Sequence, residues 1–269
     1  MRGVFLVVSL FLMALNGCIT PTAIVTEKQP GKTDFSEMMP DDLTGRMEYN
    51  EKSGFYYLFE YDNNNLYLTL AVKDQTLQRK IVNFGFTVWI DREGGDERKQ
   101  GFRFPVGLPA DMAFSELRRQ QDEGTGLITG DMRSMLERVD NIDLIGIYGT
   151  SVRRVKMRDS RIPVKAEFVS GILLYEAVVP FEALKFGYNP LDEGSTAGLG
   201  LETGFLERRS PSERETPPGV EPGTGQRYPG GMNGRTPRRM TDPRLTDTPS
   251  GEIEALTKPT ELWIKLKFK

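Results

Sequence analysis

The stretch GFYYLFEYDNNNLYLTLAVKD, residues 54–74, decides the fold that we expect for this chain. Both halves are strand-like blocks rich in aromatic and apolar residues. Asp62, Asn63 and Asn64 separate the halves, and such side chains hydrogen bond to nearby backbone and tolerate left-handed conformations. The stretch therefore predicts an antiparallel hairpin with strands at 54–62 and 65–74.

Similar strand patterns recur along the rest of the chain, with turn residues between them. We expect strands at 84–91, 101–106, 142–149, 164–170, 172–181, 197–207 and 261–268. Helical periodicity is clearest at 110–123, with a second candidate at 131–139. Many short strands with one or two short helices favour an all-β fold, namely an antiparallel β-sandwich.

The first 17 residues predict a bacterial lipoprotein signal peptide. An apolar run from Val4 to Leu15 has the length of a signal h-region and is too short to span a bilayer. The sequence LNGC at 15–18 resembles a lipobox, where the cysteine is lipidated and the precursor is cleaved before it. We therefore expect Cys18 to anchor the protein to the bacterial outer membrane, facing the periplasm. The alternatives are a signal cut elsewhere and an apolar N-terminal strand of a cytosolic protein.

Composition divides the remainder into a tether and one interrupted domain. Residues 18–40 contain prolines and little periodicity, which predicts a flexible tether without a core. The domain is expected to span 41–269, with a disordered Pro/Gly/Arg-rich insertion at 208–258. Because a strand is predicted after the insertion, both ends of the insertion should meet the same sheet.

The residue counts exclude several classes of function. The chain has one cysteine and no histidine, so an intramolecular disulfide and a cysteine-based zinc site are excluded. The lack of histidine removes the commonest general base and disfavours haem binding. The net charge of −3 argues against a nucleic-acid partner. We therefore expect no enzymatic activity.

Trp89 and Trp263, the two tryptophans of the chain, are the candidate ligand-binding residues. Trp89 falls on the more polar face of the strand at 84–91, and Trp263 lies on the lysine-bearing face of the strand at 261–268. A tryptophan so placed can stack on a sugar ring or bind a cation, or it can be covered by a helix or by the arginines of the insertion. Tyr67 is a weaker candidate for the same surface.

Acidic residues in the turn after the strand at 84–91 form a candidate calcium site. Asp91, Glu93 and Asp96 supply hard carboxylate oxygens at close spacing. Basic residues lie among them, so the alternative is a solvated hairpin whose charges neutralise one another. Calcium is the one cofactor that the sequence suggests.

The order of the segments also resembles a known family. The segments are YDNNNLYLTLAVKD, QRKIVNFGFTVWID, GFRFPVG, LYEAVVPFEAL and GLGLETGF. Together they resemble the superfamily of family 9 carbohydrate-binding modules, particularly lipoproteins of Bacteroidetes-type bacteria, over most of residues 41–207 and the last strand. The resemblance implies a jelly-roll-like sandwich that binds glycan or cell-wall polysaccharide without catalysis. The alternatives are a structural lipoprotein that docks another envelope protein and binds no sugar, and a hydrolase with a carboxylate pair.

Overall fold

The computed structural model describes residues 20–27, 44–108, 129–149, 151–184, 195–206 and 254–268. Its strands are β1 (Thr22–Glu27), β2 (Glu48–Asn50), β3 (Phe55–Tyr61), β4 (Asn65–Val72), β5 (Phe86–Asp91), β6 (Gly101–Arg103), β7 (Asn141–Ile145), β8 (Val152–Lys156), β9 (Val164–Val169), β10 (Ile172–Pro180), β11 (Thr196–Thr203) and β12 (Glu261–Phe268). Its helices are α2 (Gln75–Phe84), α4 (Thr129–Glu137), α5 (Phe181–Leu184) and the 3-10 helix η2 (Met157–Asp159).

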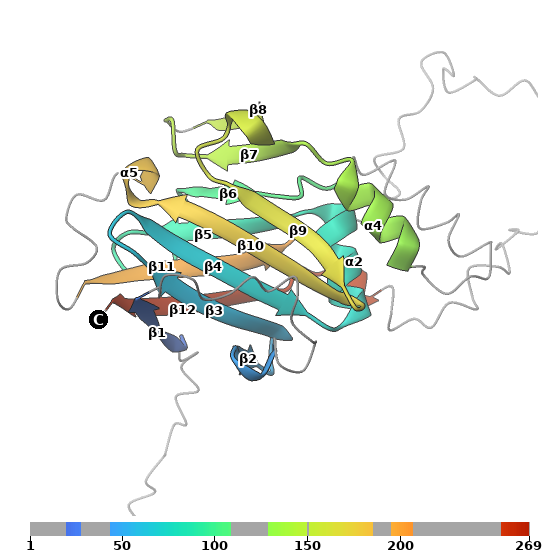
Figure 1. The fold of residues 1–269 in the computed structure, drawn as a ribbon, viewed down its shortest axis with the longest axis horizontal. Coiled ribbons are helices and arrows are strands. Elements are labelled where there is room, and N and C mark those ends of the chain that lie inside the picture. Colours follow the sequence, from blue (N-terminus) through green and yellow to red (C-terminus); the bar gives the residue numbers. More distant parts are fainter. Residues whose placement is uncertain are drawn as a thin grey trace, which may run out of the picture.

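The strands form one curled sheet whose two halves pack face to face (Figure 1). Their order is β8-β7-β6-β5-β11-β12-β1-β3-β4-β10-β9, and β2 pairs with β3. We call the half from β8 to β12 sheet A, and the half that contains β2, β3, β4, β10 and β9 sheet B. All strand pairs within each half are antiparallel. The all-β prediction and its two-layer form are confirmed.

Apolar side chains from both sheets fill the space between the layers. Phe86 of β5 illustrates the contact across the layers, because its ring centroid lies 5.8 Å from that of Phe55 and 5.1 Å from that of Tyr175. All three side chains are buried. Burial of one large apolar side chain contributes about 1.5–3 kcal/mol, so these contacts fix which face of each strand points inward.

The hairpin predicted at residues 54–74 is confirmed. Strands β3 and β4 pair antiparallel, with Tyr61 opposite Leu66. The Asp62 carboxylate accepts hydrogen bonds from the backbone N–H groups of Asn64 and Asn65, each at 2.8 Å. The turn is thus held by the side-chain chemistry that the sequence indicated.

Strand β1 differs from the expectation, because Thr22–Glu27 lies within the predicted tether at 18–40. It pairs parallel with β12 on one side and with β3 on the other, so it joins the two sheets and makes the whole sheet mixed. Ala23 and Val25 explain the difference, since they alternate toward the core and are 2% and 0% exposed. The strand also satisfies backbone groups that β12 and β3 would otherwise leave at open edges.

The residues on either side of the insertion lie next to each other, as expected. β11 and β12 pair antiparallel, and the backbone N–H of Leu206 donates to the carbonyl oxygen of Leu256 at 2.8 Å. Leu256 is already buried, so the fold resumes before the predicted boundary at 258. Most of the insertion, and the predicted helix at 110–123, lie outside the described residues.

Helix α2 was not expected from the strand pattern, although the sequence contains its signals. The Asp74 carboxylate caps its first turn by accepting the N–H of Leu77 at 2.7 Å. Gly85 ends it with a φ of 95°, a conformation that favours glycine. The predicted helix at 131–139 is confirmed as α4. Within the part of the chain that the structure describes, no helix is both long and apolar enough to cross a membrane.

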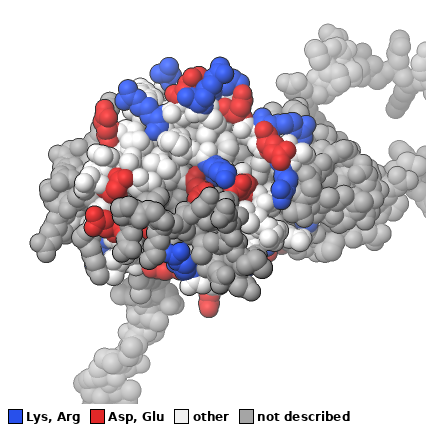
Figure 2. Space-filling model, in the orientation of Figure 1, with Lys and Arg blue, Asp and Glu red and all other residues white. Residues whose placement is uncertain are grey.

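Charged side chains mark one edge of sheet A. Strand β8 pairs only with β7 among the described strands, and it carries Arg153, Arg154 and Lys156. Figure 2 shows basic side chains gathered at the top of the molecule, where Figure 1 places β8. Charges on an edge strand oppose pairing with a second sheet.

Replacing Asp74 tests the cap of α2. Asp74→Ala should lower the free energy of unfolding by about 1 kcal/mol, because the N–H of Leu77 loses its acceptor. Urea denaturation followed by circular dichroism measures this change. Asp74→Ser, which keeps a capping oxygen, should lie close to the parent protein. Equal losses in the two variants would contradict the capping role.

Candidate functional site

Trp89 and Trp263 lie on one surface, the outer face of sheet A. Gly200 of β11 is the register partner of both Trp89 on β5 and Trp263 on β12. Their neighbours Val88 and Ile264 are fully buried in the core, so the alternation of side chains directs both indoles outward. Neighbouring strands lie about 4.8 Å apart, which puts the two tryptophan backbones about 10 Å from each other.

Each indole lies over a glycine of the neighbouring strand. A Cβ atom on Gly200 would come within 2.7 Å of Cζ2 of Trp263, and a Cβ on Gly101 within 3.1 Å of Cε3 of Trp89. Gly101, which belongs to β6, is the register partner of Trp89 on β5. Glycine weakens a strand interior and marks places where another group approaches the backbone closely. We call these four residues the tryptophan platform, in which both indoles are half-buried.

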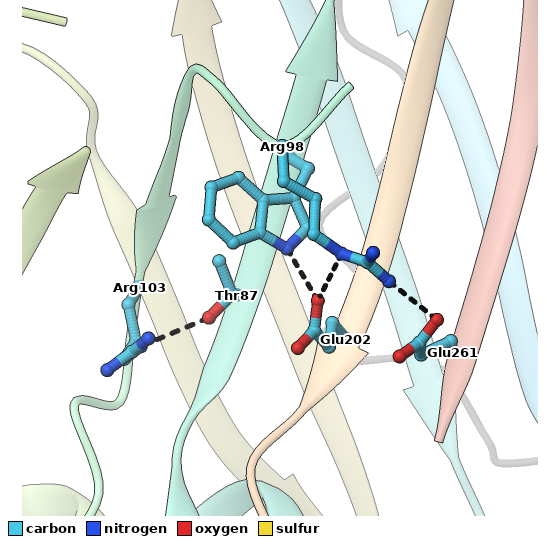
Figure 3. Close-up of polar contacts among 6 residues, drawn as sticks. Thr87, Arg98, Arg103, Glu202 and Glu261 are labelled. Atoms are coloured by element: carbon cyan, nitrogen blue, oxygen red, sulfur yellow. Dashed lines mark hydrogen bonds and ion pairs between the residues drawn. The ribbon is translucent and has the colours of Figure 1, made fainter. Parts of the chain in front are cut away.

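A carboxylate and a guanidinium hold the platform in place (Figure 3). The indole Nε1–H of Trp89 donates to Oε2 of Glu202 at 2.8 Å, and Nε of Arg98 donates to the same oxygen at 3.0 Å. Nη2 of Arg98 donates to Oε2 of Glu261 at 2.7 Å. Glu202 therefore fixes the orientation of the Trp89 ring.

Arg98 also lies over the ring of the second tryptophan. Its guanidinium carbon lies 5.8 Å from the ring centroid of Trp263, within the range of a cation–π contact. Partial burial alone would lower the pKa of Arg98, but the charges of Glu261 and Glu202 outweigh it and raise the pKa. The side chain remains 45% exposed. Arg98 belongs to the turn between β5 and β6, whereas the alternative drawn from the sequence placed such an arginine in the insertion.

A row of polar side chains runs beside the platform, two residues further along each strand. Across sheet A the row contains Arg154, Asp143, Arg103, Thr87, Glu202 and Glu261. Nε of Arg103 donates to Oγ1 of Thr87 at 3.1 Å (Figure 3). Arg154 binds Asp143 through two hydrogen bonds of 2.7 and 2.9 Å. The aromatic surface is therefore flanked by hydrogen-bond donors and acceptors on the same face.

Tyr67 does not share this surface, contrary to the expectation. It belongs to β4 in sheet B and lies between Glu60 and Val178 on the neighbouring strands. Its hydroxyl donates to Oδ2 of Asp62 at 2.5 Å, which ties the strand to the preceding turn. The alternation along β4 identified the outward face, but which sheet a strand joins depends on pairing that the sequence alone does not specify.

Asp91 holds the acidic turn after β5 together. Asp91 is 6% exposed, and its carboxylate accepts the backbone N–H groups of Glu93 at 2.9 Å and Glu97 at 3.0 Å. Glu93 and Asp96 are exposed. Among the described residues, no three Asp, Glu, His or Cys side chains come together in a group that could hold a metal ion. Asp91 thus stabilises the turn through its carboxylate, and calcium binding by Asp91, Glu93 and Asp96 stays a prediction.

Arg98, Glu202 and the two glycines were missed at the level of sequence. The sequence of β11, TAGLGLET at residues 196–203, indicated one of these glycines. Gly198 and Gly200 occupy alternate positions in it, on the side of the strand that faces away from the core. Their partners could not be read without the register of β5, β11 and β12. Cys18, the expected lipidation site, lies outside the described residues.

Comparison with known proteins gives distant structural likenesses. No protein-family model matches the chain, and no curated protein matches it. It is similar to a family 9 carbohydrate-binding module from Caldicellulosiruptor kristjanssonii solved in complex with glucose, with 11% identity, a TM-score of 0.32, and coverage of 68% of this chain and 77% of that chain. The complex of a module of this family from the same organism with cellotriose gives 12% identity, a TM-score of 0.31, and coverage of 67% and 74%.

The pair formed by Asp62 and Tyr67 predicts a pH-dependent stability. Burial alone would raise the pKa of the Asp62 carboxyl, but the hydrogen bonds from Tyr67, Asn64 and Asn65 outweigh burial and lower its pKa. The hydrogen bond to Asp62 raises the pKa of the Tyr67 hydroxyl, as does its partial burial. A lowered carboxyl pKa stabilises the fold above the unfolded value of 3.8, and this contribution is lost as pH falls through the folded value.

Chemical denaturation of Tyr67→Phe and the parent protein at several pH values measures this effect. The parent should be the more stable protein between about pH 5 and 8, and the difference should shrink below about pH 4. In an Asp62→Asn background, Tyr67→Phe should cause no acid-dependent change. A difference that is constant with pH would contradict the role of the pair.

Proposed function

We propose that this protein is a lipid-anchored, non-catalytic glycan-binding protein of the bacterial envelope, and that the tryptophan platform is its binding surface. One observation carries the proposal: Trp89 and Trp263 lie on the same outer face, each resting on a glycine of the next strand. Flat, half-exposed indoles suit the apolar C–H faces of sugar rings, which aromatic side chains stack against.

The flanking polar row supports the same ligand class. Sugar hydroxyls at the edge of a stacked ring need hydrogen-bond partners. Glu202, Glu261 and Arg103 lie beside the platform and can supply acceptors and donors for them. Glu261 is 38% exposed at its side chain, so its carboxylate can accept a further hydrogen bond. The hydrogen bond from Trp89 to Glu202 fixes the ring before binding, which lowers the entropic cost of association.

The arrangement at the platform favours binding over hydrolysis. Glycoside hydrolysis uses two carboxyl groups on either side of the scissile bond, one of which supplies a proton. Glu202 and Glu261 both bind the guanidinium of Arg98 and lie on one side of the tryptophans. They are therefore suited to orient hydroxyl groups of a ligand.

The N-terminal sequence supports the lipid-anchor part of the proposal. The apolar run before LNGC at 15–18 supports export and lipidation of Cys18. More than one acyl chain on the cysteine would make anchoring stable, because a single chain binds a bilayer only marginally. We extend the proposal to an outer-membrane lipoprotein that faces the periplasm.

Substitution of the tryptophans tests glycan binding. Trp89→Ala and Trp263→Ala should each weaken binding to responsive polysaccharides by about tenfold, since a stacked aromatic ring contributes on the order of 1 kcal/mol or more. Glycan arrays identify the responsive polysaccharides, and isothermal titration calorimetry measures the affinities. Gly200→Val should also weaken binding, because a side chain there would displace the Trp263 ring.

Tyr49→Ala is the matched control. Tyr49 is 50% exposed and belongs to β2 in sheet B, away from the platform. This variant should bind as the parent does. The proposal is wrong if no saccharide binds, or if both tryptophan variants retain the affinity of the parent.

Mass spectrometry of the protein purified from membranes tests the anchor. The mature chain should begin at Cys18 and carry the added mass of its acyl groups. Cys18→Ser should shift the protein from the membrane fraction to the soluble fraction, because the attachment atom is lost. An unmodified thiol in the native protein would contradict the anchor and leave the platform proposal unaffected.

A further inference from the structure

The platform is part of a longer row that crosses sheet A from β12 to β8. Beyond Trp89, Gly101 pairs with Ile145 of β7, and Ile145 pairs with Val152 of β8. The row therefore consists of Trp263, Gly200, Trp89, Gly101, Ile145 and Val152. Every member is apolar or glycine, and Figure 1 shows the six strands following one another from β8 at the top to β12 below.

The open end of the row is solvent-accessible. Val152 is 60% exposed on the edge strand, and Ile145 is half-buried next to it. Val152 lies among the basic residues of β8 and does not pack in the core. Val155 is the residue of β8 that packs against the core. The row thus offers an apolar strip that continues past the two indoles to the edge of the sheet.

The length of the row determines what size of ligand it suits. Six strands about 4.8 Å apart span about 24 Å, which is several sugar rings in an extended chain. The row runs across the strands, and the polar row from Arg154 to Glu261 runs parallel to it. A linear glycan laid along the row would place its ring faces on apolar side chains and its hydroxyl groups over the polar row.

The ordinary twist of β-sheets bears on which physical form of a polysaccharide suits the row. Neighbouring strands are rotated by about 20–25°, so side chains two strands apart face directions that differ by about 40–50°. Trp89 and Trp263 are two strands apart. A flat crystalline surface cannot lie against both faces at once. A single glycan chain can, because its glycosidic linkages rotate.

We propose that the binding surface takes a single extended glycan chain, laid across the strands from Trp263 toward Val152, in preference to a monosaccharide or a crystalline polysaccharide. This inference rests on the proposed glycan-binding function and specifies the form of its ligand. It gives Ile145 and Val152 the role of a distal contact that only longer chains reach.

Calorimetry with oligosaccharides of graded length tests the inference. The probes are β-1,4-linked glucose and β-1,4-linked N-acetylglucosamine chains of one to six units, because both are extended. The affinity for at least one series should rise about tenfold or more between two and six units. An excess of the soluble six-unit chain should release the protein from microcrystalline cellulose or chitin.

A substitution at the distal end separates length dependence from general binding. Val152→Asp should lower the affinity for the six-unit chain several-fold and leave the affinity for the two-unit chain unchanged. Ser151→Asp is the matched control, because it adds the same charge at the adjacent exposed residue, outside the row. Circular dichroism checks that both variants are folded.

The outcomes separate this inference from the proposed function. Binding with equal affinity for one and six units, or tighter binding to the crystalline polymers than to soluble chains, overturns the extended-chain inference and leaves glycan binding standing. An equal loss for short and long chains in Val152→Asp also overturns it. Absence of binding to both series, together with a blank glycan array, overturns the proposed function itself.

Discussion

The register of β5, β11 and β12 is the constraint on which the described site depends. Side chains alternate between the two faces of a sheet, so a slip of one residue would turn the tryptophans inward and leucines outward. Burial of Val88, Leu199 and Ile264 between the sheets prevents such a slip. The same alternation brings Trp89, Gly200 and Trp263 into one row. Core packing thus determines the geometry of the outer surface.

The outer face of sheet A depends on glycines as well as on the side chains that contact the two indoles. Gly200 leaves room for the Trp263 ring, and Gly101 leaves room for both the Val88 carbonyl oxygen and the Trp89 ring. Glu202 then orients the Trp89 ring by a hydrogen bond, and Arg98 pairs with that carboxylate while its guanidinium lies over the Trp263 ring. Rings that are already held in place would lose less entropy when a ligand binds.

The sequence predicted the parts of the structure that depend on local alternation. The hairpin at 54–74, the final strand and the outward direction of Trp89 and Trp263 all follow from side-chain periodicity. Pairing between distant segments could not be predicted, which explains why Tyr67 was placed on the wrong surface and why Glu202 was missed. Strand β1 escaped prediction because only Ala23 and Val25 mark its buried face within a short, proline-flanked stretch.

If Cys18 carries lipid as proposed, the position of β1 would limit the distance between the folded body and the membrane. Thr22, its first residue, comes four positions after Cys18. A chain of four residues reaches about 14 Å at full extension. With lipid on Cys18, the sandwich would therefore sit directly against the headgroups, since β1 is held between β12 and β3. Such a small standoff distance would let the bilayer restrict the directions from which a polymer approaches.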